Sequence, residues 1–135
     1  MEDTDRIKAY ITSHKVENAV IVGAGFIGLE MAENLHQTGA HVSVVEMGNQ
    51  VMAPVDFSIA SHVHQHLQQK GVSLFLEQSV EGFERKEDKV EVLLKSGQTL
   101  STDMVILSIG VRPRTELAKK AGIVLGETGG IRVDA

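Results

Sequence analysis

The chain has 135 residues, of which 42% are hydrophobic, which is enough for one core and too little for two domains of ordinary size. Its formal charge of -5 comes from 13 basic and 18 acidic residues without a basic stretch, so we expect no nucleic-acid partner. We find no signal-peptide pattern and no apolar run long enough to cross a bilayer, and therefore expect a cytoplasmic protein without a membrane partner. The chain contains no cysteine, which excludes disulfides and thiolate chemistry.

The first half of the chain alternates between expected helices and strands. In order, these are a helix ending near 13–14, a strand at 19–23, a helix at 25–37, a strand at 40–46, a helix ending at 70–71 and a strand at 72–76. Asp3 or Thr4 is in position to cap the first helix. Asp56 or Ser58 is in position to cap the third. Strand, helix and strand in this order predict parallel pairing through right-handed crossovers.

The second half begins with a change of pattern. Three short strands with tight connections are expected at 79–86, 89–95 and 98–102, followed by a strand at 104–107, a short helix at 116–121 and a glycine-rich tail at 126–130. Alternation of apolar and charged residues in the three short strands predicts an antiparallel meander with one covered face. The continuous apolar run at 104–107 predicts a strand that is buried on both faces.

These elements predict an α/β fold. The expected architecture is a Rossmann-like parallel sheet with flanking helices and an inserted three-stranded antiparallel β-meander. We expect an N-terminal helix that packs beside the domain, with its lead-in, at 1–16, the Rossmann-like domain at 17–111, and a C-terminal helix and tail at 112–135.

Three glycines lie between the first long strand and its helix. They are Gly23, Gly25 and Gly28, in the spacing Gly-x-Gly-x-x-Gly. The first permits a sharp turn out of the strand, the second lets the backbone approach a pyrophosphate closely, and the third lets the helix pack tightly on the sheet. The pyrophosphate would rest on free amides at the helix start, where the macrodipole favours negative charge. The motif therefore predicts a dinucleotide site.

An acid closes the second strand of the same unit. A carboxylate at the position of Glu46 can accept both hydroxyls of an adenosine ribose. It would also repel a 2′-phosphate, and residues 47–52 offer no Arg or Lys to hold one. We therefore expect NAD(H) as the cofactor in preference to NADP(H).

Together these features resemble one family, the pyridine nucleotide-disulfide oxidoreductases. Its members are flavoproteins with an FAD domain, an inserted NAD(P)H domain and a C-terminal dimerisation domain. The resemblance rests on residues 23–33, on Glu46, on the inserted meander and on the segment Ser-Ile-Gly-Val-Arg-Pro at 108–113. It covers roughly residues 17–125. The branch that the sequence resembles most is that of coenzyme A-disulfide reductases, NADH oxidases and NADH peroxidases.

The resemblance implies where the adenosine half of the cofactor lies. The three glycines would shape the pyrophosphate loop, with Ile27 near the pyrophosphate. Glu46 would take the adenosine ribose, and we include its neighbour Met47 among the candidate cofactor-binding residues.

The resemblance also implies where the nicotinamide half lies. Gly110 would approach the nicotinamide side of the cofactor, with Ile109 beside it. Phe26 stands where relatives often carry an aromatic ring over the flavin face, and Glu30 where they place a carboxylate near the nicotinamide amide. On the residues alone, Phe26 would be a core aromatic at a helix start and Glu30 a favourable first-turn acid.

The function that the resemblance implies is that of an oxidoreductase. This chain would be its NADH-binding domain, placing nicotinamide for hydride transfer to FAD, with no catalytic residue of its own. The FAD domain of the parent chain would be its partner, and the parent enzyme would be a homodimer. Because no FAD-binding glycine segment precedes Met1 and no redox cysteine is present, we expect an excised middle domain that binds without turnover. Its tail would lead toward the missing FAD domain.

Two other nucleotide-binding functions fit the sequence less well. A regulatory NAD-sensing module would share the glycines, the acid and the length, but the meander and the segment at 108–113 depart from its alternating strands and helices. A self-contained dehydrogenase would need a substrate domain and an acid-base pair. The one tyrosine, Tyr10, lies outside the expected site.

Metal and hydrolase chemistry are also weakly indicated. His62, His64 and His66 are close in sequence, but only two of them can share a helix face. We expect His62 and His66 to be partly buried structural residues beside the apolar stripe, and we expect no metal. No Gly-x-Ser-x-Gly motif frames a serine, which argues against a hydrolase.

Overall fold

The computed structural model describes residues 2–133, and it confirms the expected order of elements. The elements are α1 (Glu2–Ser13), β1 (Asn18–Val22), α2 (Phe26–Gln37), β2 (His41–Val45), α3 (Phe57–Gln69), β3 (Ser73–Phe75), β4 (Val80–Lys86), β5 (Lys89–Leu94), β6 (Thr99–Thr102), β7 (Met104–Leu107) and α4 (Glu116–Lys120). The expected caps are not formed. Because α1 already begins at Glu2, Asp3 and Thr4 lie inside the helix. Asp56 is the N-cap residue of α3, but its side chain caps no amide.

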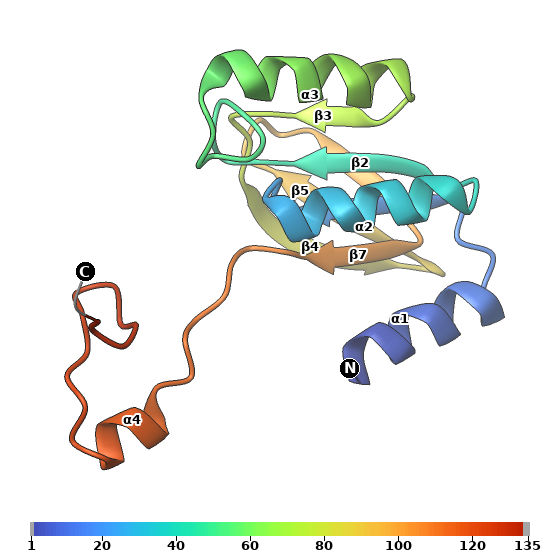
Figure 1. Ribbon diagram of the computed structural model, residues 1–135. Coiled ribbons are helices and arrows are strands. Elements are labelled where there is room, and N and C mark those ends of the chain that lie inside the picture. The colour runs from blue at the N-terminus through green and yellow to red at the C-terminus, as the bar shows by residue number, and fades with distance from the viewer. Residues whose placement is uncertain (1, 134–135) are drawn as a thin grey trace.

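Four of the strands form a parallel sheet in the order β3-β2-β1-β7. β1 lies in its interior, where Ala19 pairs with Val42 of β2 on one side and with Met104 of β7 on the other. Figure 1 shows α2 and α3 along one side of this sheet. Because the strands are parallel, the segments that follow β1, β2 and β7 all emerge on the same side of the sheet, at the carboxyl ends of the strands.

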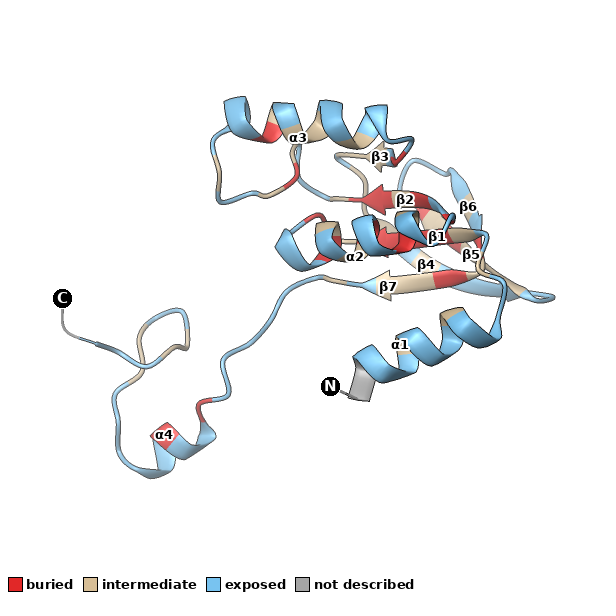
Figure 2. Ribbon diagram, turned by 45° about the vertical axis from the view of Figure 1, so that its right-hand side comes forward, coloured by how far each residue is buried: buried red, intermediate tan, exposed pale blue. Residues whose placement is uncertain are grey.

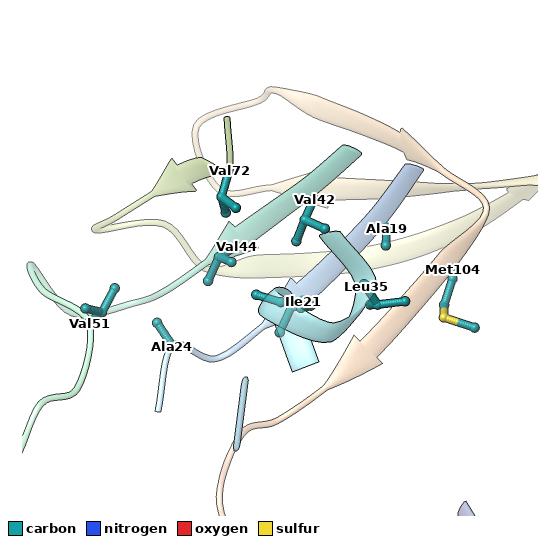
Figure 3. Packing of buried hydrophobic residues seen from close by; sticks show 10 residues of the cluster. Ala19, Ile21, Ala24, Leu35, Val42, Val44, Val51, Val72 and Met104 are labelled. Carbon is teal, nitrogen blue, oxygen red and sulfur yellow. The ribbon is translucent and has the colours of Figure 1, made fainter. Parts of the chain in front are cut away.

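The helices α2 and α3 cover one face of the parallel sheet. Ile21, Val44 and Leu35 are fully buried in this layer, and Figure 3 shows their side chains converging between strands and helix. Burying one such side chain contributes about 2 kcal/mol relative to leaving it in water. This apolar layer therefore holds α2 against the strands that precede and follow it.

The meander covers the opposite face. β4, β5 and β6 form a separate antiparallel sheet in that order, and Val92 and Leu94 of β5 pack with Val20 and Val45 of the parallel sheet. Side chains alternate along a strand, so Val20 points away from the helices while Ile21 points toward them. The interior strand β1 is thus buried on both faces, and the expected one-sided covering of the meander is confirmed.

The interpretation of 104–107 as a strand buried on both faces is correct only in part, because Ile106 packs against the helical-face core and Val105 against the meander side, and both are half-buried. β7 is an edge strand of the sheet, and Leu107 at its end is 58% exposed. Met104 is buried at the start of the strand, where it joins the helical-face core. The four apolar residues therefore form an outermost strand of the sheet, and the last of them is exposed to solvent.

The two terminal segments differ in how they meet this core. The half-buried side chains of Ile11 and Val16 pack against the helical-face core, which agrees with the expectation that the first helix packs beside the domain. Figure 2 shows α4 and the tail lying apart from the two sheets and largely exposed. Leu125 and Ile131 pair in an isolated antiparallel bridge within that tail. No helix within residues 2–133 combines the length and the apolar character needed to span a membrane.

Asp103, between β6 and β7, joins the meander to the parallel sheet. One carboxylate oxygen accepts the amides of Glu17 and Asn18 at 3.0 and 2.8 Å. The other lies 3.1 Å from the Lys89 ammonium at the start of β5. Burial acts to raise the pKa of this carboxyl, but the two amides and the ammonium outweigh it, so that its pKa lies below the ordinary value. The ionised form of Asp103 therefore stabilises the fold.

We expect Asp103→Ala to lower the free energy of unfolding by about 2 kcal/mol near neutral pH, because two amides and an ammonium lose their acceptor. A carboxyl with a depressed pKa stabilises the fold above the pKa of the unfolded chain, about 3.9, and this contribution is lost as the pH falls through the lower folded-state value. Urea denaturation should therefore show the difference between the parent chain and the variant shrinking below about pH 4. Asp88→Ala, in an exposed turn, is the control. A difference that did not change with pH would contradict this role.

Candidate functional site

A crevice of about 550 Å³ lies at the carboxyl ends of β1, β2 and β7. The meander supplies one wall, from residues 78–83. The other lining residues include Gly23, Gly25, Glu46, Met47, Leu107, Ser108 and Ile109. The crevice thus brings together the glycine motif, the strand-end acid and the segment after β7, which are far apart in the sequence.

Gly23 and Gly28 are required by the close approach of backbone segments. Gly23 has a φ of +101°, and a Cβ built on it would lie 2.3 Å from the carbonyl oxygen of Ser108. A Cβ on Gly28 would lie 2.0 Å from the carbonyl oxygen of Gly23. Both distances are far below van der Waals contact. The first glycine therefore permits the turn out of β1, and the third lets α2 start directly against it, as the motif predicts.

Gly25 differs from both of these glycines. Its φ of -73° and ψ of 179° are open to any residue, and a Cβ built on it would have no atom of the chain within 4 Å. Gly25 is the N-cap residue of α2, and no side chain caps the helix. The first intrahelical bond of this turn runs from the Leu29 amide to the Gly25 carbonyl at 3.0 Å. The amides of residues 26–28 therefore form the open helix start.

The carboxylate of Glu46 links the two loops at the crevice. One of its oxygens accepts the amide of Ala24, in the glycine turn, at 2.8 Å. The other accepts the amide of Gly48, in the loop after β2, also at 2.8 Å. A carboxylate has about four acceptor positions, so two remain after these bonds. The carboxylate of Glu46 is therefore held in one position and can still accept further hydrogen bonds.

Several apolar side chains at the carboxyl ends of the strands are exposed. Phe26 and Ile27 at the helix start, Met47 after β2 and Ile109 after β7 are all exposed. The alternative of a core aromatic at Phe26 is wrong, because 55% of this residue is exposed. The alternative of a first-turn acid at Glu30 is also wrong, since the first turn of α2 contains no acidic residue.

The predicted site residues divide between two neighbouring hollows. The crevice is lined by Gly23, Gly25, Glu46, Met47 and Ile109. Phe26 and Glu30 line a separate groove of about 400 Å³ between α2 and α3. Of the remaining three, Gly28 packs inward, Ile27 is exposed at the helix start, and Gly110 follows Ile109 with a φ of +116°.

The role expected for His62 and His66 falls to His64 instead. His62 and His66 are exposed, whereas His64 is half-buried and its Nε2 accepts the amide of Val51 at 3.0 Å. The spacing contains a signal for this, because position 64 lies four residues after Ala60 and three before Leu67, on the inward side of α3. Among the described residues, no group of three or more His, Cys, Asp or Glu side chains is placed to hold a metal ion.

Comparison with known proteins identifies the family. A family model described as pyridine nucleotide-disulphide oxidoreductase matches residues 1–135. The chain belongs to this family. The NADH oxidase of Methanocaldococcus jannaschii is 41% identical over 128 residues, which are 94% of this chain and 28% of that protein.

Solved structures of the family share the fold. The structure of reduced Bacillus anthracis CoADR-RHD is 48% identical, with a TM-score of 0.90, and covers 99% of this chain and 24% of its own. The water-forming NADH oxidase from Lactobacillus brevis, bound to NADH, is 31% identical, with a TM-score of 0.80, and covers 94% of this chain and 28% of its own. The predicted family and Rossmann-like fold are confirmed. The chain spans less than a third of the length of these oxidoreductases.

The three glycines should respond differently to an added methyl group. We expect Gly28→Ala to lower the free energy of unfolding by about 3 kcal/mol, because its Cβ meets a backbone oxygen that cannot move away freely. Gly25→Ala should stay within about 1 kcal/mol of the parent chain, since the weaker cap is offset by the lower entropy of the unfolded chain. Thermal or urea denaturation of both variants measures this. Equal losses at the two positions would refute the distinction.

Proposed function

We propose that this chain is the NADH-binding domain of a flavin-dependent oxidoreductase of the pyridine nucleotide-disulfide family. Its role would be to place nicotinamide for hydride transfer to FAD held elsewhere in the parent protein. The observation that carries the proposal is Gly25, a glycine that no contact within the described chain requires. Open space at the start of an uncapped helix suits a dinucleotide pyrophosphate, and the fixed carboxylate of Glu46 suits the ribose hydroxyls next to it.

The pyrophosphate is assigned to the start of α2. The amides of Phe26, Ile27 and Gly28 precede the first intrahelical bond and carry the positive end of the helix dipole. With no side chain capping this turn, an anion would provide acceptors for these donors. The missing Cβ at Gly25 leaves room for the phosphate oxygens to approach the backbone.

The adenosine ribose is assigned to Glu46. Its two occupied acceptor positions hold the carboxylate between Ala24 and Gly48. The two free positions match the two hydroxyls of a ribose, each of which can donate one hydrogen bond. The loop at residues 47–52, which we call the adenosine loop, contains no Arg or Lys. A 2′-phosphate would thus meet a negative charge and no compensating cation.

The nicotinamide half is assigned to the segment after β7 and, from the family resemblance, to Phe26 and Glu30, which line the neighbouring groove between α2 and α3. Ile109 and Phe26 are exposed and offer apolar surface to a ring, while Glu30 offers a carboxylate to the carboxamide. When bound together in the parent protein, NADH and FAD supply the hydride chemistry themselves. The residues of this chain contribute binding and orientation.

Glu46 provides the first test of this function. We expect the chain to bind NADH at least about tenfold more tightly than NADPH, measured by titration of amide signals in NMR spectra. Glu46→Ala should weaken NADH binding about tenfold and reduce the preference for NADH, because the ribose hydroxyls lose their acceptor. Glu81→Ala, which removes another carboxylate from the same crevice, is the matched control. A preference for NADPH, or unchanged NADH affinity in Glu46→Ala, would sink the assignment.

Gly25 provides the second test. Gly25→Ala should weaken NADH binding about tenfold, because the added Cβ takes the room that the pyrophosphate oxygens need. The denaturation experiment on the same variant shows whether the fold is intact, so loss of affinity and loss of structure are measured separately. Gly39→Ala is a poor control because of its positive φ, whereas Gly130→Ala, in the tail with open space around it, is a suitable one. A Gly25→Ala variant that binds NADH like the parent chain would remove the main support of the proposal.

A further inference from the structure

The adenosine loop is anchored to α3 through His64. The Nε2 atom of His64 accepts the amide hydrogen of Val51 at 3.0 Å, so this ring carries its own hydrogen on Nδ1. The Val51 side chain is fully buried in the helical-face core. The His64 ring also meets Phe57 edge-on, with 6.1 Å between ring centroids. The half-buried side chain of His64 therefore provides the acceptor for the backbone amide of Val51, a residue that is buried away from water.

The next residue of the loop, Met52, is bonded to the glycine turn on the other side of the loop. The amide of Met52 donates to the carbonyl of Ala24, in the glycine turn, at 2.8 Å. Met52 has a φ of +52°, a left-handed conformation that disfavours a residue with a side chain. Such a conformation persists only where surrounding contacts hold it. The bonds at Val51 and Met52 are two such contacts, one to α3 and one to the glycine turn.

Both ends of the adenosine loop thus meet the same turn. At its start, Glu46 accepts the amides of Gly48 and Ala24. At its end, Met52 donates to Ala24 while His64 holds Val51. A shift of the loop at Val51 would be transmitted through Ala24 to the carboxylate that faces the crevice.

We propose that His64 is a positioning residue for the adenosine half of the cofactor. It acts through Val51 and the adenosine loop on Glu46 and touches no cofactor atom itself. This inference rests on the proposed function of the crevice. It concerns the adenosine end, because the hydrogen bonds of this path run through Val51, Met52 and Ala24 and end at the carboxylate of Glu46.

The test compares three substitutions at one position. In Gln the amide oxygen lies as many bonds from Cβ as Nε2 does in His, whereas in Asn it matches Nδ1. His64→Gln should therefore keep the bond to Val51 and bind NADH within about threefold of the parent chain, while His64→Asn and His64→Leu should bind about tenfold more weakly. His62→Leu, on the exposed side of α3, is the matched control. Reduced nicotinamide mononucleotide, which lacks the adenosine half, should bind the parent and all variants alike.

A second measurement does not depend on any ligand. Hydrogen exchange of the Val51 amide should be at least about tenfold faster in His64→Leu than in the parent chain or in His64→Gln, because the amide loses its acceptor. The ¹⁵N signals of His64 should report the tautomer with its hydrogen on Nδ1.

The outcomes separate the two proposals. If the parent chain binds no NADH, the proposed function fails and so does a role for His64 in binding, while the exchange rate still shows whether His64 holds the loop. If the parent chain binds NADH but folded His64→Leu binds it equally well, the function stands and the positioning role is overturned. Equal losses for His64→Gln and His64→Leu, or for NADH and reduced nicotinamide mononucleotide, would overturn it too. If His64→Leu does not fold, the contrast between Gln and Asn decides.

Discussion

At Gly23, three backbone segments meet without a side chain between them: the end of β1, the start of α2 and the residue after β7. α2 begins so close to the Gly23 carbonyl oxygen that a Cβ on Gly28 would lie 2.0 Å from it, and the end of β7 approaches so closely that a Cβ on Gly23 would lie 2.3 Å from the Ser108 oxygen. This contact fixes where α2 starts relative to β1 and β7. The position of the helix start, and hence of its free amides and of the positive end of its dipole next to Gly25 at the crevice, follows from it.

Two of the three glycines are required by the fold, and the third is not. Gly23 and Gly28 are closed in by other backbone atoms, whereas nothing of the described chain approaches the position of a Cβ on Gly25. Close to this open position, the side chain of Glu46 is fixed by two backbone amides.

The sequence predicts the features that depend on spacing along the chain, and not those that depend on partners far away in it. The glycine spacing and the acid at Glu46 locate the crevice correctly, since one β-α-β unit brings them together. The run at 104–107 looks the same in an interior strand and at an edge, and only the order of the sheet distinguishes the two. His64 is predictable as an inward residue of α3 from its helical spacing. Its bond to Val51 is not, because it depends on how an irregular loop folds back.

The meander explains how a sheet with both helices on one face can be stable and still present an open site. A parallel sheet requires cover on both faces, and here α2 and α3 cover one face while β5 packs Val92 and Leu94 on the other. The same insertion then extends past the carboxyl ends of the strands, where residues 78–83 form a wall of the crevice. Asp103 ties this insertion to the start of β1 through two amides and Lys89. Anything that loosens the meander from the sheet therefore removes both the cover of a hydrophobic face and one wall of the crevice, which couples the stability of this fold to the shape of the proposed site.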